Sequence, residues 1–147
     1  WVDMLNNLRL GRRVVHGCKV NRLDRAEALH IIRAERDKIS QAREIYIYGH
    51  SRGGAIALQI WWEILDTLPL DCNINVTVTA AKPTGDRAFV YCAHMDGVVT
   101  AYRQRGDIIP FLPPWQANIK HKPIGRWQPA WKAHAVKNYR GCNPWKT

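Results

Sequence analysis

The stretch IYIYGHSRGGAI, residues 45–56, joins a β-rich run to a run of helix formers through a serine flanked by glycines. Ser51 lies between Gly49 and Gly53 in a GxSxG pattern, where the expected strand ends and the expected helix begins. Small residues at such a point let the chain turn sharply and hold the serine hydroxyl above the edge of a sheet. The pattern alone also arises by chance, so its position between a strand and a helix is what favours a nucleophile elbow.

Strands and helices are expected to alternate on both sides of this turn. Periodicity and residue type predict helices at 24–40 and 53–65, and strands at 13–16, 44–48, 74–79 and 98–103, with a less regular strand at 88–93. Such alternation predicts an α/β fold with a mostly parallel sheet flanked by helices. A length of 147 residues fits a single domain over residues 1–147.

Beyond Pro110 the sequence changes character, because prolines become frequent. We expect an ordered loop excursion here, since proline removes a backbone donor and interrupts regular structure. Three tryptophans, Trp115, Trp127 and Trp131, are expected to pack against the rest of the protein, because exposed tryptophan is costly in a monomer.

The charge is strongly basic, with 22 Lys and Arg against 12 Asp and Glu, a net charge of +10. A basic surface favours anionic partners such as acidic lipid headgroups, a charged envelope polymer or nucleic acid, although it can also serve solubility alone. No basic and aromatic motif of a nucleic-acid module occurs, which disfavours nucleic acid. The sequence contains no apolar run of the ~20 residues that a membrane-spanning helix needs and no signal-peptide pattern, so we expect a soluble or peripheral protein.

Four cysteines, Cys18, Cys72, Cys92 and Cys142, are too far apart to form a CxxC pair. We expect buried thiols, with one or two disulfides as the alternative. The histidines have no metal-ligand spacing, so neither a metal nor another cofactor is expected.

A serine hydroxyl needs a base and an orienting carboxylate, and both are available downstream of Ser51. Asp107 follows the strand expected at 98–103 and is the preferred acid, because it would lie at the carboxyl end of a parallel strand. Asp96 and Asp86 are the competing acids.

Two downstream histidines compete for the role of base. His134 is preferred over His121, because two lysines flank His121 and would oppose its protonation. His50 adjoins the serine and is expected to pack or hydrogen-bond near the elbow.

Five short blocks, in order along the chain, resemble the class 3 or fungal-type lipases of the α/β-hydrolase superfamily. GHSRGG at 49–54 is similar to the family's GHSLGG, and RGDIIPFLP at 105–113 is similar to its NxDIVPxLP. The other blocks are AAKPTGDRAF at 80–89, HAVKNY at 134–139, and VHGC at 15–18 after DMLNN. The resemblance implies Ser51 as nucleophile, Asp107 as acid, His134 as base and the Arg52 N–H as an oxyanion donor, without a cofactor.

Three features differ from the family pattern. Arg52 stands where the family has Leu, and Lys82 stands where it has Ser. The loop that carries the family's second oxyanion donor, upstream of the DMLNN block, is absent from the sequence. These differences favour a minimal or amino-terminally truncated member of the family.

The leading hypothesis is a lipase or esterase that cleaves lipid or other acyl esters through an acyl-enzyme on Ser51. Its partners would be the ester substrate and an anionic membrane or envelope surface. The alternative is a catalytically weak hydrolase-like module that binds an anionic polymer or nucleic acid through its basic surface.

Overall fold

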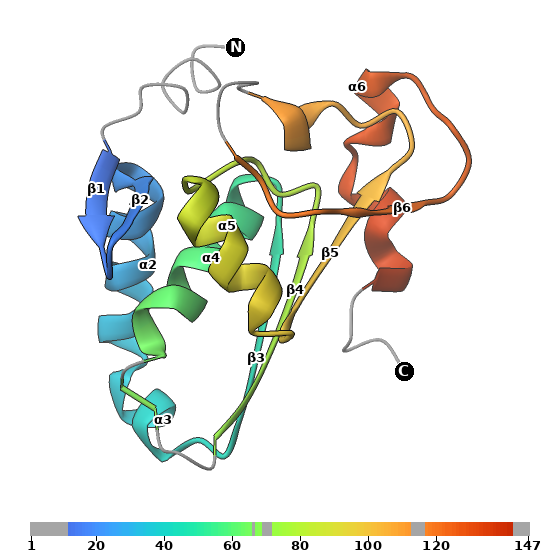
Figure 1. Cartoon of the computed structure of the whole chain (residues 1–147). Helices are drawn as coiled ribbons and strands as arrows, with labels where there is room; N and C mark the ends of the chain where they lie inside the picture. Colours follow the sequence, from blue (N-terminus) through green and yellow to red (C-terminus); the bar gives the residue numbers. More distant parts are fainter. Residues whose placement is uncertain (1–11, 66, 69–71, 113–116, 143–147) are drawn as a thin grey trace.

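The computed structural model describes residues 12–65, 67–68, 72–112 and 117–142 (Figure 1). Within these ranges, four parallel strands form the larger sheet in the order β3-β4-β5-β6. Their bounds are Glu44–His50, Asn73–Thr79, Val99–Gln104 and Lys122–Ile124. His50 pairs with Thr79, which pairs with Tyr102, so the three longer strands end at one edge of the sheet. The predicted α/β fold with a parallel sheet is confirmed.

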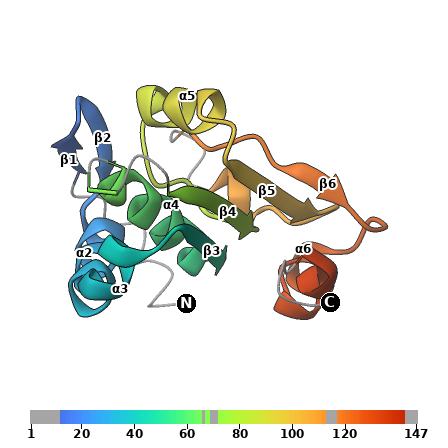
Figure 2. The same cartoon turned by 90° about the horizontal axis from the view of Figure 1, so that it is seen from below.

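Helices cover both faces of this sheet. Helix α4 (Arg52–Ile64) packs on β3 and β4, and α2 (Arg22–Ala34) packs on α4. Helices α5 (Arg87–Met95) and α6 (Ala130–Ala133) lie on opposite sides of the sheet (Figure 2). The 3-10 segment η2 (Val136–Cys142) contacts β4 and β5. Helix α5, which precedes β5 in the chain, therefore lies on one side of the sheet, and α6, which follows β5, lies on the other.

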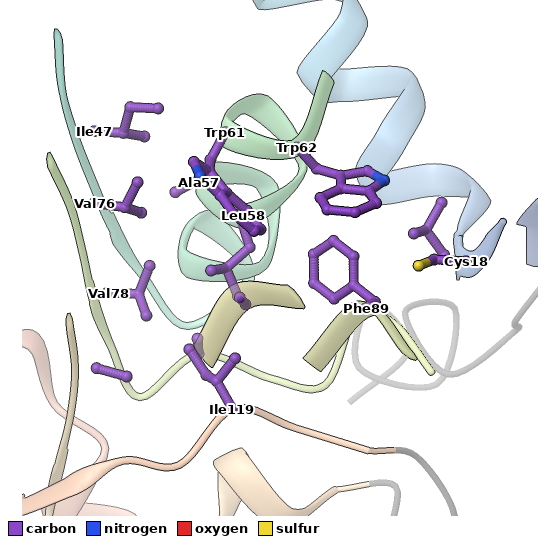
Figure 3. Close-up of a cluster of buried hydrophobic side chains, with 14 of the residues drawn as sticks. Cys18, Ile47, Ala57, Leu58, Trp61, Trp62, Val76, Val78, Phe89 and Ile119 are labelled. Atoms are coloured by element: carbon purple, nitrogen blue, oxygen red, sulfur yellow. The ribbon is translucent and has the colours of Figure 1, made fainter. Parts of the chain in front are cut away.

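The main core lies between the sheet and the pair α4 and α5 (Figure 3). Trp61 and Leu58 of α4 are fully buried and face Val76 and Val78 of β4. Phe89 of α5 adds an edge-on contact, with its ring centroid 6.1 Å from that of Trp61. Each large apolar side chain buried in this way contributes ~1.5–3 kcal/mol to stability. This core holds α4 in place, and it thereby positions Ser51, the residue that precedes the helix.

The strand expected at 88–93 is wrong, because this segment is helix α5. Asp86 caps the helix by accepting a hydrogen bond from the Phe89 N–H at 3.0 Å. Phe89 and Ala93, four residues apart, are the buried positions, which is the spacing of a helix rather than a strand. A carboxylate cap ahead of a four-residue apolar spacing was the signal for helix.

Two other expectations differ in their bounds. The helix expected at 24–40 is two helices, α2 and α3 (Arg36–Gln41), which are separated at Glu35. The strand expected at 13–16 is half of a hairpin, β1 (Arg12–Val15) and β2 (Cys18–Asn21). His16 and Gly17 join its strands with φ values of 47° and 79°, the left-handed backbone that two-residue hairpin turns require.

The described part of the segment after Pro110, residues 111–112 and 117–142, combines loop with short regular elements, and the prediction that its tryptophans pack inward is wrong for the two that are described. Trp127 is 72% exposed and Trp131 is 80% exposed. Trp115 lies outside the described residues. Regular structure here is short and consists of η1 (Ile109–Phe111), β6, α6 and η2.

All four cysteines are free thiols, but only Cys18 is fully buried, so the expectation of four buried thiols is wrong. Burial and the neighbouring Cys92 raise the pKa of Cys18 to about 11. In the described part of the chain, none of the helices combines the length and apolar character needed to cross a bilayer. The single domain over residues 1–147 stays a prediction.

Candidate active site

Ser51 occupies a strained turn between β3 and α4. Its φ of 56° and ψ of −118° are unfavourable for a residue with a side chain, and such conformations cost ~1–3 kcal/mol. Its N–H donates to the carbonyl oxygen of Thr79 at 2.9 Å, which ties the turn to the end of β4. The packing of α4 on the sheet maintains this conformation and places the side chain at the carboxyl edge of the strands.

The glycines around Ser51 have different reasons to be small. A Cβ on Gly49 would collide with the backbone of Gly53, and a Cβ on Gly54 would lie 2.8 Å from the Cβ of Ala81. A Cβ on Gly53 would meet nothing within 4 Å. The close approach of strand and helix therefore requires Gly49 and Gly54, whereas Gly53 is not required by packing.

His134 links Ser51 to Asp107. Its Nε2 lies 2.8 Å from the Oγ of Ser51, and its Nδ1 lies 3.0 Å from the Oδ2 of Asp107 and 3.2 Å from Oδ1. His134 directly follows helix α6, and Asp107 follows β5, so three distant segments meet at one edge of the sheet. This geometry lets the imidazole accept a proton from the serine while the carboxylate fixes its orientation.

Asp107 is held by donors on several sides and is only 1% exposed. The Tyr139 hydroxyl donates to Oδ2 at 2.6 Å, and the Ile109 N–H donates to Oδ1 at 3.0 Å. Burial raises the pKa of Asp107, but the hydrogen bonds from His134 and Tyr139 outweigh it and hold the pKa below its ordinary value. The carboxylate is therefore ionised at neutral pH and can stabilise a protonated imidazole.

Tyr139 is a residue whose contribution the sequence did not identify beyond its place in HAVKNY. Its hydroxyl accepts from the Gln104 N–H at 2.8 Å while it donates to Asp107, so it joins η2 to the end of β5. Burial and the adjacent carboxylate of Asp107 raise the pKa of Tyr139 well above its ordinary value. The tyrosine is thus a neutral donor.

His50 lies beside the elbow and hydrogen-bonds there, as predicted. Its Nδ1 is 3.0 Å from the Oγ1 of Thr79, and its Nε2 is 3.1 Å from the carbonyl oxygen of His134. Burial, followed by the nearby His134, lowers the pKa of His50. A neutral His50 therefore anchors the backbone of His134 from the strand side.

The competing acids and base have other contacts. Asp86 caps α5 and also accepts from the Lys19 N–H at 2.9 Å. Asp96 accepts from the Nε1 of Trp61 at 3.0 Å. His121 is buried and lines a separate cavity. Of the candidates, Asp107 and His134 are the ones that the structure brings to Ser51.

The two side chains that differ from the family pattern converge on one buried carboxylate, Asp24 of α2. The Nζ of Lys82 lies 2.9 Å from its Oδ2, and the Nε of Arg52 lies 3.8 Å from its Oδ1. Arg52 also pairs with Glu27 at 3.1 Å. The Arg52 side chain is thus directed away from Ser51, while its backbone N–H belongs to the first turn of α4, where helix geometry provides no intrahelical partner.

Within the described residues, no group of three or more His, Cys, Asp or Glu side chains is placed to hold a metal ion.

The family model described as Lipase (class 3) matches residues 14–117, well over half of the chain. None of the curated proteins compared with the chain matches it.

Solved structures of fungal lipases share this fold at low sequence identity. Lipase II from Rhizopus niveus aligns with a TM-score of 0.62 and 16% identity over 97% of this chain and 63% of that one. The Rhizomucor miehei triacylglyceride lipase aligns with a TM-score of 0.60 and 18% identity over 99% and 63%. The mono- and diacylglycerol lipase from Aspergillus oryzae aligns with a TM-score of 0.62 and 18% identity over 76% and 44%. The chain thus spans between two fifths and two thirds of these structures.

Proposed function

This chain belongs to the class 3 lipase family, and on that premise we propose that it is a serine carboxylic-ester hydrolase. The observation that carries the proposal is the continuous hydrogen-bonded series from Ser51 Oγ through the His134 imidazole to the Asp107 carboxylate. A serine becomes an effective nucleophile when a base lies within hydrogen-bond reach and a third group orients that base.

In the proposed reaction, the Oγ of Ser51 attacks the carbonyl carbon of an ester while His134 Nε2 takes the hydroxyl proton. The tetrahedral intermediate collapses as His134 returns this proton to the departing alcohol oxygen, which leaves an acyl group on Ser51. Water then attacks the acyl carbon while the same imidazole accepts a proton from it. The bond from this carbon to Ser51 Oγ breaks as His134 gives the proton to Oγ, and the carboxylic acid is released. Asp107 stays ionised throughout and stabilises the imidazolium.

We assign the Arg52 N–H as a donor to the oxyanion of the tetrahedral intermediate. It lies directly after Ser51 at the amino end of α4, where backbone donors and the helix dipole favour negative charge. Removing one such donor typically lowers the rate ~10²- to 10³-fold.

We propose acyl esters of lipids as the substrate class. The three similar structures are described as lipases, and two of their descriptions name acylglycerols or triacylglycerides as substrates. These descriptions support lipid esters as the substrates, and not small esters alone.

Exposed aromatic and basic side chains near α6 support contact with an anionic lipid surface. Trp127 and Trp131 are exposed, and Arg126 and Lys132 beside them are exposed as well. Tryptophan is favoured at the level of lipid headgroups, and basic side chains are attracted to acidic lipids. We expect a Trp127→Ala, Trp131→Ala variant to sediment less with anionic vesicles, and unchanged sedimentation would contradict this role.

The proposed activity is tested by hydrolysis of short and long p-nitrophenyl esters. Ser51→Ala should abolish turnover above background, whereas Ser40→Ala should leave it unchanged, because the Ser40 hydroxyl lies on helix α3 and donates to the Asp37 carbonyl oxygen of the same helix. Equal rates of ester hydrolysis for the unaltered chain and for Ser51→Ala would contradict the proposed enzymatic activity. In that case salt-dependent binding of polyanions would favour the alternative of a basic binding module.

A further inference from the structure

The residue before the proposed nucleophile also contacts the residue that carries the proposed base. His50 is the last residue of β3 and lies in register with Thr79 of β4. Its Nε2 lies 3.1 Å from the carbonyl oxygen of His134, which is 84 positions further along the chain. The strand end that leads into Ser51 is therefore joined directly to the backbone of His134.

The partners of the His50 ring determine which of its nitrogens carries the proton. A carbonyl oxygen can only accept a hydrogen bond, so Nε2 carries the proton and donates to His134. The ring is neutral at neutral pH, because burial, followed by the nearby His134, lowers the pKa of His50. In the neutral ring Nδ1 is an acceptor, and the Thr79 hydroxyl, 3.0 Å away, donates to it. A hydrogen-bonded series from Thr79 through His50 thus ends at the His134 carbonyl oxygen.

Two neighbouring rings hold the His50 imidazole in this orientation. Its centroid lies 5.1 Å from that of His134 and 5.1 Å from that of Tyr139. The Tyr48 hydroxyl lies 3.3 Å from the Oγ1 of Thr79, and it donates there because the Thr79 proton is directed to His50. These contacts restrict the rotation of the ring and keep its Nε2 directed at the carbonyl oxygen.

The backbone around His134 is otherwise supported by contacts within its own segment. Helix α6 has only four residues, and the His134 N–H donates to the Ala130 carbonyl oxygen at 3.3 Å. The side-chain amide of Asn138 donates to the carbonyl oxygens of Lys132 at 2.7 Å and Ala133 at 3.2 Å. The bond from His50 is different, because it ties the His134 backbone to the parallel sheet.

We propose that His50 is a positioning residue for the reaction, because its Nε2–H holds the His134 backbone and thereby keeps the His134 imidazole between Ser51 and Asp107. This inference rests on the proposed hydrolase. One strand end then sets the positions of nucleophile and base together, which accounts for the 2.8 Å between Ser51 Oγ and His134 Nε2. His50 acts through His134 and exchanges no proton with the substrate. A misplacement of ~1 Å at a reacting group can lower the rate ~10²-fold, so a tether of this kind affects turnover.

NMR of the whole chain with ¹⁵N-labelled histidine tests the contact without ester turnover. At neutral pH the couplings between ring nitrogens and carbon-bound protons identify the tautomer of His50, whose signals are assigned by their absence from His50→Gln. We expect the Nε2–H tautomer, and the Nδ1–H tautomer would overturn the proposal. The proton on His134 Nδ1, which is directed at Asp107, is observed in the same samples and is assigned by its absence from His134→Gln.

His50→Met and His50→Gln form a matched pair of variants. The two side chains have similar length, but only the Gln amide can donate to the His134 carbonyl oxygen. His30→Met is the control, because His30 is an exposed histidine of α2. The His134 Nδ1 proton should remain visible in His50→Gln and His30→Met, and it should be lost to exchange with water in His50→Met.

Hydrolysis of p-nitrophenyl esters measures the effect on the reaction. His50→Met should lower kcat by about tenfold or more, as for the loss of a hydrogen bond together with the alignment that it maintains. KM should change by less than about twofold, because His50 acts on the base and not on substrate binding. His50→Gln should keep kcat within about threefold of the unaltered chain, and His30→Met should leave it unchanged.

The proposal is overturned if His50→Met keeps kcat within about twofold, if it keeps the His134 Nδ1 proton, or if His50→Gln loses as much as His50→Met. Should His50→Met fail to fold, as judged by circular dichroism, the tautomer of His50 in the unaltered chain still decides. An unaltered chain without turnover that gives the expected NMR results would contradict only the proposed hydrolase. Turnover that His50→Met leaves unchanged would contradict only the positioning role.

Discussion

Replacing Asp24 with Asn tests the ion pairs that connect α2 to the elbow. Asp24 is fully buried, and Lys82, 2.9 Å from it, has a side chain only 12% exposed. Asn keeps the shape but removes the charge, so the Lys82 ammonium is left nearly buried without a counter-charge. Removing one partner of a buried ion pair costs ~3–5 kcal/mol.

The contribution of Arg52 is smaller, because its side chain is 41% exposed and retains Glu27. Solvent screens such a pair to less than ~1 kcal/mol. The low end of the buried-pair range, a loss of about 3 kcal/mol in the free energy of unfolding, is therefore the expected effect of Asp24→Asn.

Urea denaturation followed by circular dichroism measures this loss. With a denaturant slope of about 2 kcal/mol per molar urea, the midpoint should fall by about 1.5 M. Glu27→Gln is the matched control, because it also neutralises an acid paired with Arg52 but at an exposed position, and it should cost less than ~1 kcal/mol. Adding Lys82→Met to Asp24→Asn should restore most of the stability, since no unpaired ammonium then remains. A midpoint for Asp24→Asn equal to that of Glu27→Gln would refute the reasoning.

Three further changes have definite expected outcomes. Gly49→Ala should lower the free energy of unfolding by about 3 kcal/mol, because the new Cβ would collide with the Gly53 backbone. Gly53→Ala should leave the urea midpoint equal or slightly higher, because a Cβ there meets nothing. Equal losses for both variants would contradict this packing argument. Tyr139→Phe should cost about 2 kcal/mol, because it removes the donor to the Asp107 carboxylate, and an unchanged urea midpoint would argue against that contact. Since the pKa of Asp107 is lowered on folding, its contribution is present above its unfolded pKa of ~3.9 and is lost as pH falls through its folded pKa. Urea midpoints between about pH 5 and pH 3 should therefore fall less steeply in Tyr139→Phe than in the unaltered chain, and identical slopes would count against the assignment.

The elbow was predictable because its determinants are local. Strand formers, Gly49, Ser51 and helix formers are contiguous, and the tight turn follows from their order. Asp107 was predictable for a related reason, since the residue after a parallel strand lies at a known edge of the sheet. His134 required a choice between two histidines, which a difference in neighbouring charge could resolve.

Contacts between distant segments could not be read from residue patterns. Tyr139 reaches Asp107 only because η2 returns beneath β5, and Lys82 reaches Asp24 across a sequence separation of more than fifty residues. The segment of α5 was misassigned because β-branched and aromatic residues there suggested a strand, while the cap at Asp86 and the spacing of Phe89 and Ala93 determine a helix. Trp127 was expected inside because tryptophan is usually buried, and its exposure depends on where the loop is placed.

Covalent labelling tests most directly the central claim that His134 activates Ser51. The chain is incubated with a p-nitrophenyl alkylphosphonate, digested and analysed by mass spectrometry, beside Ser51→Ala and His134→Ala. The account predicts one phosphonyl group on the peptide containing Ser51, no label in Ser51→Ala, and much slower labelling in His134→Ala with p-nitrophenol released in step with the label. A folded chain that remains unlabelled, or that labels equally fast without His134, would contradict it.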